Sequence, residues 1–477
     1  AASAGPTNGA AAAANGGGGV AGAALESAAW ENEYSMKAVM RLLVVAETAV
    51  APAASIVTEK LTSTLAKVCA NPRNPRFNHY LFESLAALVR CTVASSSADA
   101  AAREAAAARF EDFLFPPFQS VLRMDVAEFA PYVFQILALL LGMRSSVSPG
   151  YAALLPPVLH HSMWERRGNV PALTQLLEAY LRVDASAVVG GGHLEPVLGV
   201  FQKLLASKLT EGFAFRLLTV VYLSVAQPQL DPYVPVVFQL LLTRLQHHRD
   251  RLALVERVAA FVGLVAGVRG VDYVVATVDA AAAQPGVFLD VLRHVVVPVL
   301  ARASGGLAPE HVVPVVAGLA AILASVTVAD RLAPDAWTEA VACLFGILQT
   351  TPATSSPGGG ASAAPAAGLA ALAAAEVADE PQAGDFDNAF SQLSFGATDG
   401  DAALLRGLPN DPFAGVADLA QVVHHALAPL VAAKPPFQTL IQNAQVHPYA
   451  HPAGAAGSGG PSSGRPAEAA AAVRGAR

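Results

Sequence analysis

Three pairs of adjacent histidines are the first residues in this sequence that suggest metal chemistry: His160 and His161, His247 and His248, and His424 and His425. Neighbouring residues on a helix point in different directions, whereas two histidines that chelate one ion from a helix are four positions apart. The sequence also has no HExxH motif, no glycine-rich phosphate loop and no hydrolase nucleophile elbow. We therefore predict no metal, no cofactor and no enzyme activity.

The densest group of positive charges lies at the end of a predicted helix at 231–246 and just after it. It consists of Arg244, His247, His248, Arg249, Arg251 and Arg257. Guanidinium groups bind carboxylates strongly and with defined geometry, so this cluster suits an acidic partner surface. Alternatively, it is a solvated group of cations stabilised by the helix dipole. We take Arg244, Arg249 and Arg251 as candidates for partner contact.

Trp164 lies in a charged segment between two predicted helices and is followed by Glu165, Arg166 and Arg167. Trp and Arg are enriched where proteins bind one another, so Trp164, Arg166 and Arg167 are also candidates for partner contact. The alternative is a tryptophan packed across the turn between two helices, with both arginines in solvent.

An acidic group follows a Pro/Gly/Ala-rich stretch and consists of Glu376, Asp379, Glu380, Asp385 and Asp387. Long-range attraction to a basic partner would raise its association rate. A solvated acidic loop is the alternative, and the sequence leaves both open.

The elements that must position these residues are helices with a shared apolar pattern. Apolar residues recur at helical spacing in three segments. They are Phe129, Tyr132, Val133, Ile136, Leu137 and Leu140, then Leu173, Leu176, Leu177, Tyr180 and Leu181, then Val197, Val200, Phe201, Leu204 and Leu205. Prolines at 116, 131, 156, 171 and 196 alternate at 15 and 25 residues, and we expect each just ahead of or within the first turn of a helix.

A period of about 40 residues with two helices per repeat is typical of HEAT or armadillo arrays. One such repeat cannot bury its own apolar face, so neighbouring repeats stack and share one core. The sequence therefore predicts an all-α fold, an α-solenoid of HEAT repeats. We expect low-complexity sequence at 1–25, the array at 26–350, an acidic loop at 351–384, a helical segment at 385–433 and a disordered tail at 434–477.

Composition supports a helical protein without a membrane or nucleic-acid function. The sequence is 54% hydrophobic and carries a net charge of −7, which argues against nucleic-acid binding. The uncharged run 312–329 only just reaches spanning length and follows the 40-residue period, so we predict a buried helix there and not a membrane span. Three scattered cysteines without a CxxC pair indicate reduced, mostly buried thiols.

Several segments, in the expected order, resemble the C-terminal half of the importin-alpha re-exporter family, part of the importin-beta (karyopherin) superfamily. These segments are Arg76-Phe-Asn-His-Tyr-Leu-Phe-Glu83, Glu128-Phe-Ala-Pro-Tyr-Val-Phe-Gln135, Trp164-Glu-Arg-Arg-Gly-Asn-Val-Pro-Ala-Leu173, Leu198-Gly-Val-Phe-Gln-Lys-Leu-Leu-Ala-Ser-Lys208 and Asp387-Asn-Ala-Phe-Ser-Gln-Leu-Ser-Phe395. Compared with the family pattern, 96–108, 186–193 and 352–375 look like Ala- and Gly-rich expansions.

The resemblance implies a HEAT-repeat nuclear export receptor that binds importin-alpha as cargo together with Ran in its GTP form. It also implies contacts with nuclear pore proteins and shuttling between nucleus and cytoplasm. The N-terminal half of such receptors, which supplies the principal GTPase-binding repeats, lies outside this sequence. A HEAT scaffold of another class, such as a phosphatase or coat subunit, remains an alternative, as does a membrane or enzyme role.

Overall fold

The computed structural model describes residues 31–70, 72–95, 99–303, 306–351, 392–395, 408 and 410–451. These residues form helices and connecting turns, and none of them lies in a strand. They divide into two compact units. Unit 1 contains the described residues up to Glu128 and residues 392–395, and unit 2 contains the rest, from Phe129 onward. The predicted all-α class is confirmed.

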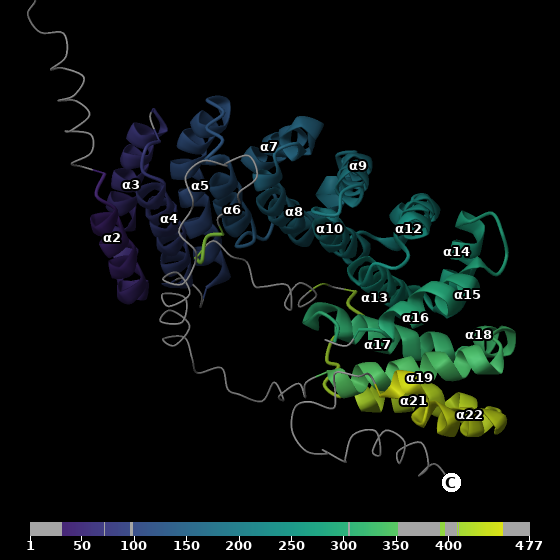
Figure 1. Cartoon of the computed structure of the whole chain (residues 1–477). Coiled ribbons are helices and arrows are strands. Elements are labelled where there is room, and N and C mark those ends of the chain that lie inside the picture. Colours follow the sequence, from purple (N-terminus) through teal and green to yellow (C-terminus); the bar gives the residue numbers. More distant parts are fainter. Residues whose placement is uncertain are drawn as a thin grey trace, which may run out of the picture. The chain divides into compact units, whose positions relative to one another are not determined.

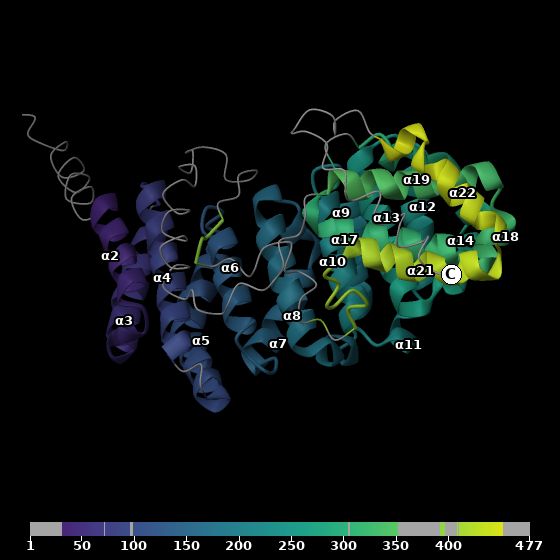
Figure 2. The same ribbon diagram turned by 90° about the horizontal axis from the view of Figure 1, so that it is seen from below.

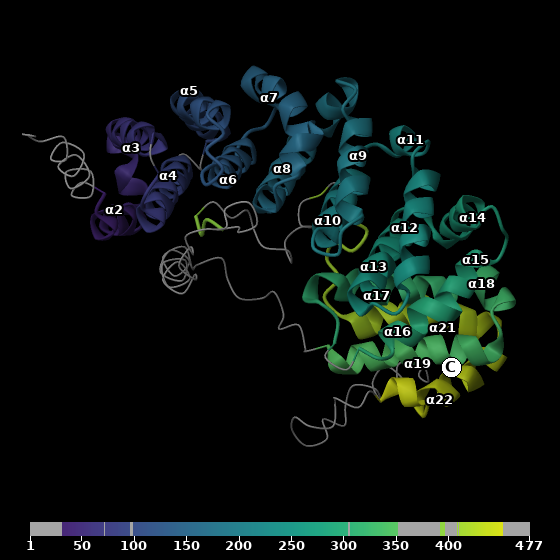
Figure 3. The ribbon, with the colours of Figure 1, turned by 45° about the horizontal axis from the view of Figure 1, so that its top comes forward.

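Unit 1 consists of α2 (Glu33–Ala46), η1 (Glu47–Ala53), α3 (Ala54–Cys69), α4 (Pro75–Ser95) and α5 (Ala100–Arg123). α2 packs on α4, and α3 packs on α5, so the helices lie in two rows (Figure 3). The inner face of α4 is apolar, since Leu81, Leu85, Leu88 and Val89 are all buried.

In unit 2 the longer helices also form two rows, which we name the A row and the B row (Figures 1 and 3). The A row contains α7 (Pro149–Leu159), α9 (Leu194–Leu205), α12 (Val234–His248) and α14 (Val271–Ala281). The B row contains α6 (Ala130–Leu141), α8 (Val170–Gly190), α10 (Glu211–Ser224), α13 (Leu252–Arg269) and α17 (Pro309–Ala324). Each B-row helix packs on the next.

The first four B-row helices begin at Ala130, Val170, Glu211 and Leu252, which confirms the period of about 40 residues. Every apolar residue of the three predicted stripes is buried. The expected proline positions are only partly correct. Pro131 and Pro171 open helices, and Pro196 lies in the first turn of α9, but Pro116 and Pro156 lie deep inside α5 and α7. A proline in the interior removes one helical hydrogen bond and bends the helix.

Shorter elements complete the connections of unit 2. They are η2 (His161–Trp164), η3 (Arg167–Asn169), α11 (Gln227–Leu230), α15 (Val287–Val291), the π-helical η4 (Leu292–Val296), α16 (Val297–Leu300) and α18 (Val326–Arg331). The array continues with α19 (Pro334–Thr350).

The last described segment contains α21 (Leu419–Ala433), α22 (Pro436–Gln445) and η6 (Pro448–Ala450). α21 packs on α17 and α22 packs on α19 (Figure 2). Between α22 and α19 the ring of Phe437 meets that of Trp337 edge to face, with 4.8 Å between the ring centroids. The prediction of disorder from 434 onward is therefore wrong for 434–451. The expected low-complexity segment at 1–25 and the acidic loop at 351–384 lie outside the described residues, except for Thr351.

The apolar run at 312–329 does not form one long helix, because α17 ends at Ala324 and α18 begins after Ser325. Most of α17 is buried, as the solenoid interpretation predicts. Within the described part of the chain, one run, Glu33–Cys69, is long and apolar enough to cross a membrane by length and composition alone. It is interrupted by η1, where Glu47 adopts a positive φ of 45°.

α13 and α17 approach one another through two glycines. A Cβ atom added to Gly263 would lie 2.1 Å from the backbone oxygen of Pro314, and one added to Gly318 would lie 2.2 Å from the Cα of Gly263. The two helix backbones are therefore in direct contact at this crossing.

Candidate functional site

Three buried glutamates lie on successive helices of the B row: Glu178 on α8, Glu211 on α10 and Glu256 on α13. Their exposed fractions are 4%, 0% and 6%. An ionised carboxylate in the interior is costly unless cations and hydrogen-bond donors surround it. Each of the three meets a basic side chain from the next helix of the row.

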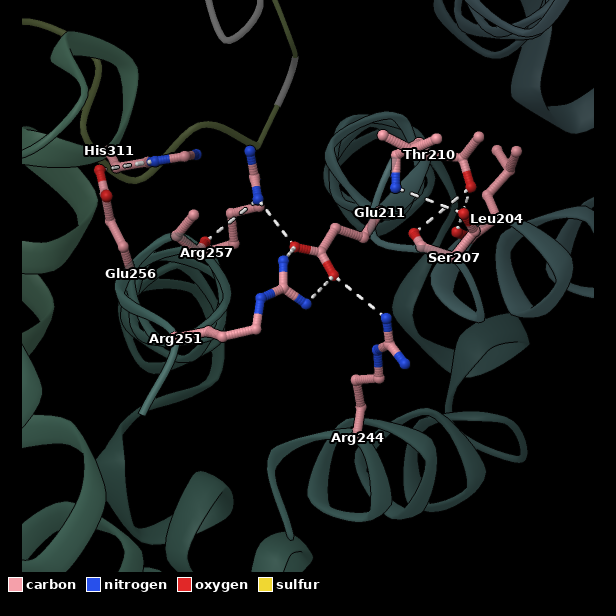
Figure 4. A network of polar contacts seen from close by, with 11 residues as sticks. Leu204, Ser207, Thr210, Glu211, Arg244, Arg251, Glu256, Arg257 and His311 are labelled. Carbon is pink, nitrogen blue, oxygen red and sulfur yellow. Dashed lines mark hydrogen bonds and ion pairs between the residues drawn. The ribbon is translucent and has the colours of Figure 1, made fainter. Parts of the chain in front are cut away.

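Glu211 is the centre of the densest of these contacts (Figure 4). Arg251 binds both carboxylate oxygens, with Nη2 at 2.5 Å from Oε1 and Nη1 at 3.1 Å from Oε2. Arg257 Nη1 lies 3.2 Å from Oε1, and Arg244 Nη2 lies 3.4 Å from Oε2. Three guanidinium groups therefore surround one carboxylate.

The local sequence places these four side chains together. Glu211 is in the first turn of α10, where a negative charge is favoured by the helix dipole, and its backbone N–H donates to Ser207. Arg251 precedes α13, Arg257 lies in its second turn, and Arg244 lies near the end of α12. Stacking of one repeat on the next brings these three elements together.

The other two glutamates make the same kind of contact. Arg216 on α10 binds both oxygens of Glu178, at 3.0 and 2.9 Å. Glu256 accepts a hydrogen bond from the backbone N–H of Ala308 at 2.6 Å, and its carboxylate lies 2.9 Å from Nδ1 of His311 on α17. We name Glu178, Glu211, Glu256 and their basic partners the glutamate ladder. It joins α8, α10, α13 and α17 in sequence.

The middle of the ladder has more positive than negative charge, because Glu211 is shared by three arginines. The pKa of His248, on the same stretch of chain, is lowered by partial desolvation and by the nearby charges of Arg244, Arg251 and His247. A surface of this kind attracts anions.

Among the described residues there is no group of three His, Cys, Asp or Glu side chains that could hold a metal ion. Cys69 and Cys343 are buried, as expected, and burial raises the pKa of their thiols to about 11 and about 12. Thiols of that kind are poor nucleophiles at neutral pH.

The structure separates the candidate residues chosen from the sequence. Arg244 and Arg251 hold Glu211, whereas Arg249 is exposed and lines a hollow of about 450 Å³ between α12 and the α14–η4 segment. Trp164 is buried at 4% exposure and its Nε1 donates to the backbone oxygen of Val158 at 2.9 Å, which is the packing alternative. Arg166 is half-buried and Arg167 is exposed. The acidic candidates Glu376, Asp379, Glu380, Asp385 and Asp387 lie outside the described residues.

Glu178, Glu211 and Glu256 are not among the candidate residues chosen from the sequence. One signal was available, since Glu178 and Glu256 interrupt apolar helical segments at positions that the helix buries. A carboxylate at such a position predicts a basic partner, but the partner is 38 to 55 residues away and only the stacking of repeats identifies it.

Comparison with known proteins gives a consistent result. The family model "CAS/CSE protein, C-terminus" matches residues 23–450. The importin-alpha re-exporter of Schizosaccharomyces pombe is 38% identical over 275 residues, covering 56% of this chain and 27% of that protein. Exportin-2 of Pagrus major is 34% identical over 322 residues, covering 67% of this chain and 32% of that protein, and the human exportin-2 is 35% identical over 278 residues, covering 58% and 28%.

Comparison with solved structures points to the same family. The exportin Cse1 in its cargo-free, cytoplasmic state superimposes with a TM-score of 0.65 and 25% identity, covering 87% of this chain and 40% of that one. That match confirms the predicted α-solenoid of HEAT repeats. The chain spans about a third of the length of the curated relatives it matches. Because the family model accounts for most of its residues, the chain belongs to the CAS/CSE family and corresponds to the C-terminal region of these proteins.

Proposed function

We propose that this chain is the C-terminal part of a nuclear export receptor that returns importin-alpha to the cytoplasm in a complex with Ran in its GTP form. The observation that carries the proposal is the match of the CAS/CSE family model over residues 23–450, together with relatives named importin-alpha re-exporter and exportin-2. The receptor acts by binding and not as an enzyme. It shuttles between nucleus and cytoplasm and contacts nuclear pore proteins during passage.

The geometry of unit 2 supports a role as a binding platform. The glutamate ladder fixes α8, α10, α13 and α17 against one another in turn through charge-assisted contacts, while each helix packs mainly on its neighbours in the array. A small change at every repeat therefore adds up along the solenoid. Cargo and GTPase become positively coupled ligands if both favour the same curvature.

Among the described candidates, Arg249 and Arg167 are the exposed cations and are proposed to contact acidic partner surfaces. Arg244, Arg251 and Arg166 would act beside them, and the acidic residues at 376–387 are proposed to attract the basic segments of cargo. Trp164 would contribute by fixing the turn that carries Arg166 and Arg167, since its indole is buried.

Capture of importin-alpha tests this function. The chain alone, and a chimera in which it replaces the matching region of the S. pombe importin-alpha re-exporter, would each be immobilised and incubated with importin-alpha. Ran locked in its GTP form or in its GDP form would be present. We expect the chimera to retain importin-alpha only with the GTP form.

Two outcomes would contradict the proposal. If the folded chimera retained no importin-alpha in either nucleotide state while the unmodified relative did, the family function would not extend to this chain. If the chain captured partners equally well without Ran, a HEAT scaffold of another class would be favoured.

A further inference from the structure

A second hollow in unit 2, of about 300 Å³, opens between α10, α13 and α17. All of its lining residues come from these three helices and from the turn Lys208–Leu209 that precedes α10. We name it the B-row groove. It adjoins the glutamate ladder, because Arg216, Arg257 and His311 belong to both.

The floor of the groove is apolar and aromatic. Phe215, Phe261 and Leu264 are buried beneath it, and Phe213 is half-buried at its side. Leu209 stands at the rim with 63% of its surface exposed. Covering this apolar surface with an aromatic or aliphatic side chain removes it from water, which favours binding.

One wall of the groove is cationic. Lys208 is exposed and forms no hydrogen bond or ion pair with any residue in the described part of the chain. Arg216 and Arg257 are held in place by Glu178 and Glu211, so their positions are fixed before a ligand arrives. The opposite wall carries Glu310 and His311, of which His311 is occupied by Glu256.

Other residues of the chain cover further parts of these three helices. Asn410 Nδ2 donates to the backbone oxygen of Leu223 at 2.9 Å, near the end of α10, and Pro412 packs where a Cβ on Gly267 would lie, near the end of α13. α21 covers part of α17. Residues 410–412 therefore lie against the C-terminal ends of α10 and α13, at the opposite end of α10 from Lys208 and Leu209.

We propose that the B-row groove binds an acidic peptide segment of a partner protein, with one aromatic or large aliphatic side chain on the phenylalanine floor and a flanking carboxylate near Lys208 and Arg257. Three cationic side chains, Lys208, Arg216 and Arg257, line the groove against one carboxylate, that of Glu310, so charge complementarity favours an acidic ligand on the Lys208 side. The volume suits one anchoring side chain and its neighbours, not a whole helix. This inference rests on the groove alone and does not depend on the export role.

Fluorescence anisotropy with a labelled synthetic peptide, Gly-Ser-Asp-Glu-Phe-Asp-Ser-Gly, tests the proposal directly on the full chain. We expect saturable binding that weakens with added salt. Replacing the peptide's phenylalanine with alanine, or its three acidic residues with their amides, should each weaken binding at least about tenfold, equivalent to about 1.4 kcal/mol.

Variants of the protein locate the site. Lys208→Glu reverses the free charge on the rim and should weaken binding about five- to tenfold. Thr219→Trp, which fills the groove from α10, should abolish binding. Lys60→Glu is the matched control, because Lys60 is an exposed lysine on α3 outside the groove, and it should leave the affinity unchanged. Circular dichroism verifies that each variant is folded.

Three results would overturn the proposal: no saturable binding by the folded chain, equal affinity for the amide peptide, or an affinity that Lys208→Glu leaves unchanged. Sedimentation of the chain distinguishes another occupant. If it self-associates and Lys208→Glu disrupts that association without affecting the peptide, the groove binds a second copy and the proposed ligand is wrong.

Discussion

The buried carboxylate of Glu83, in the middle of α4, accepts the backbone N–H of Phe395 at 3.1 Å, although the two residues are 312 positions apart in the chain. The backbone N–H of Ser394 donates to the other oxygen at 2.6 Å. Leu393 is fully buried and Phe395 is 7% exposed. A short segment from far along the chain is thus fixed to unit 1 by two charge-assisted hydrogen bonds and two apolar side chains.

The first prediction concerns this contact. Glu83→Gln removes the charge and replaces one acceptor oxygen with a donor, so we expect a loss of about 1.5–3 kcal/mol in the docking of residues 392–395. Hydrogen–deuterium exchange measures this loss, and the backbone amides of Ser394 and Phe395 should exchange about 10- to 100-fold faster in the variant. Glu59→Gln, on the exposed side of α3, is the control. Equal protection in both variants would show that Glu83 does not hold the segment.

A second prediction follows from His79, one helical turn before Glu83. Burial lowers the pKa of His79 to about 4, compared with about 6.5 in an unfolded chain. The unfolded state therefore binds more protons in this interval, so unit 1 loses stability as the pH falls from about 6.5 to about 4. At pH 5 the loss attributable to His79 is about 2 kcal/mol.

His79→Gln cannot titrate and should remove that part of the pH dependence. Glu83, whose carboxylate lies 3.7 Å from Nε2, has a pKa raised by burial. Above its ordinary pKa, Glu83 therefore stabilises unit 1 as the pH falls, which is the opposite of the effect of His79. This effect of Glu83 is present both in the unmodified protein and in His79→Gln. The measurement is exchange protection of α4 amides at pH 7 and pH 5, corrected for intrinsic rates. His294→Gln, an exposed histidine in unit 2, should leave the difference unchanged. An unaltered difference in His79→Gln would contradict the assignment.

The third prediction concerns Glu211. Glu211→Gln leaves three guanidinium groups around a neutral amide. Breaking a buried ion pair costs about 3–5 kcal/mol, and we expect the lower end because Arg244, Arg251 and Arg257 keep 17%, 25% and 26% of their side-chain surface exposed. Protection of α10 and α13 amides should fall accordingly. Glu195→Gln, an exposed glutamate in the first turn of α9, should cost less than about 1 kcal/mol. Similar losses in the two variants would show that the ladder adds no stability.

The sequence predicted the array because burial repeats at helical spacing. The stripes through Phe129, Leu173 and Val197 each mark a face that the stacked repeats cover. Glu211 could not be assigned in this way, since its role depends on Arg251, and only the stacking of α10 on α13 brings the two together. Trp164 could not be assigned for the same reason. Its local sequence is compatible both with an exposed contact residue and with a side chain packed between two helices.

The prediction of a disordered tail was wrong for α22, although the sequence carries a weak helical pattern there. Phe437, Ile441 and Ala444 fall at helical spacing on α22, and Ile441 and Ala444 are buried. Polar residues and histidines around them lowered the average hydrophobicity. α22 is ordered because it packs on α19, where Phe437 contacts Trp337, and that partner helix cannot be identified from the local sequence.

The last prediction tests the close approach of α13 and α17. In Gly263→Ala the new methyl group would lie 2.1 Å from the backbone oxygen of Pro314, so the two helices must separate. Overpacking of this kind costs about 1–3 kcal/mol or more, which exceeds the gain of about 1 kcal/mol that alanine brings to a helix. We therefore expect a lower unfolding temperature for unit 2.

Gly199→Ala is the matched control, because Gly199 is also helical and a Cβ there meets nothing within 4 Å. Gly199→Ala should gain the higher helix propensity of alanine without a steric clash, so unit 2 should unfold at the same temperature as in the unmodified protein or at a higher one. If Gly263→Ala were as stable as Gly199→Ala, the two helices would not need a glycine contact to pack.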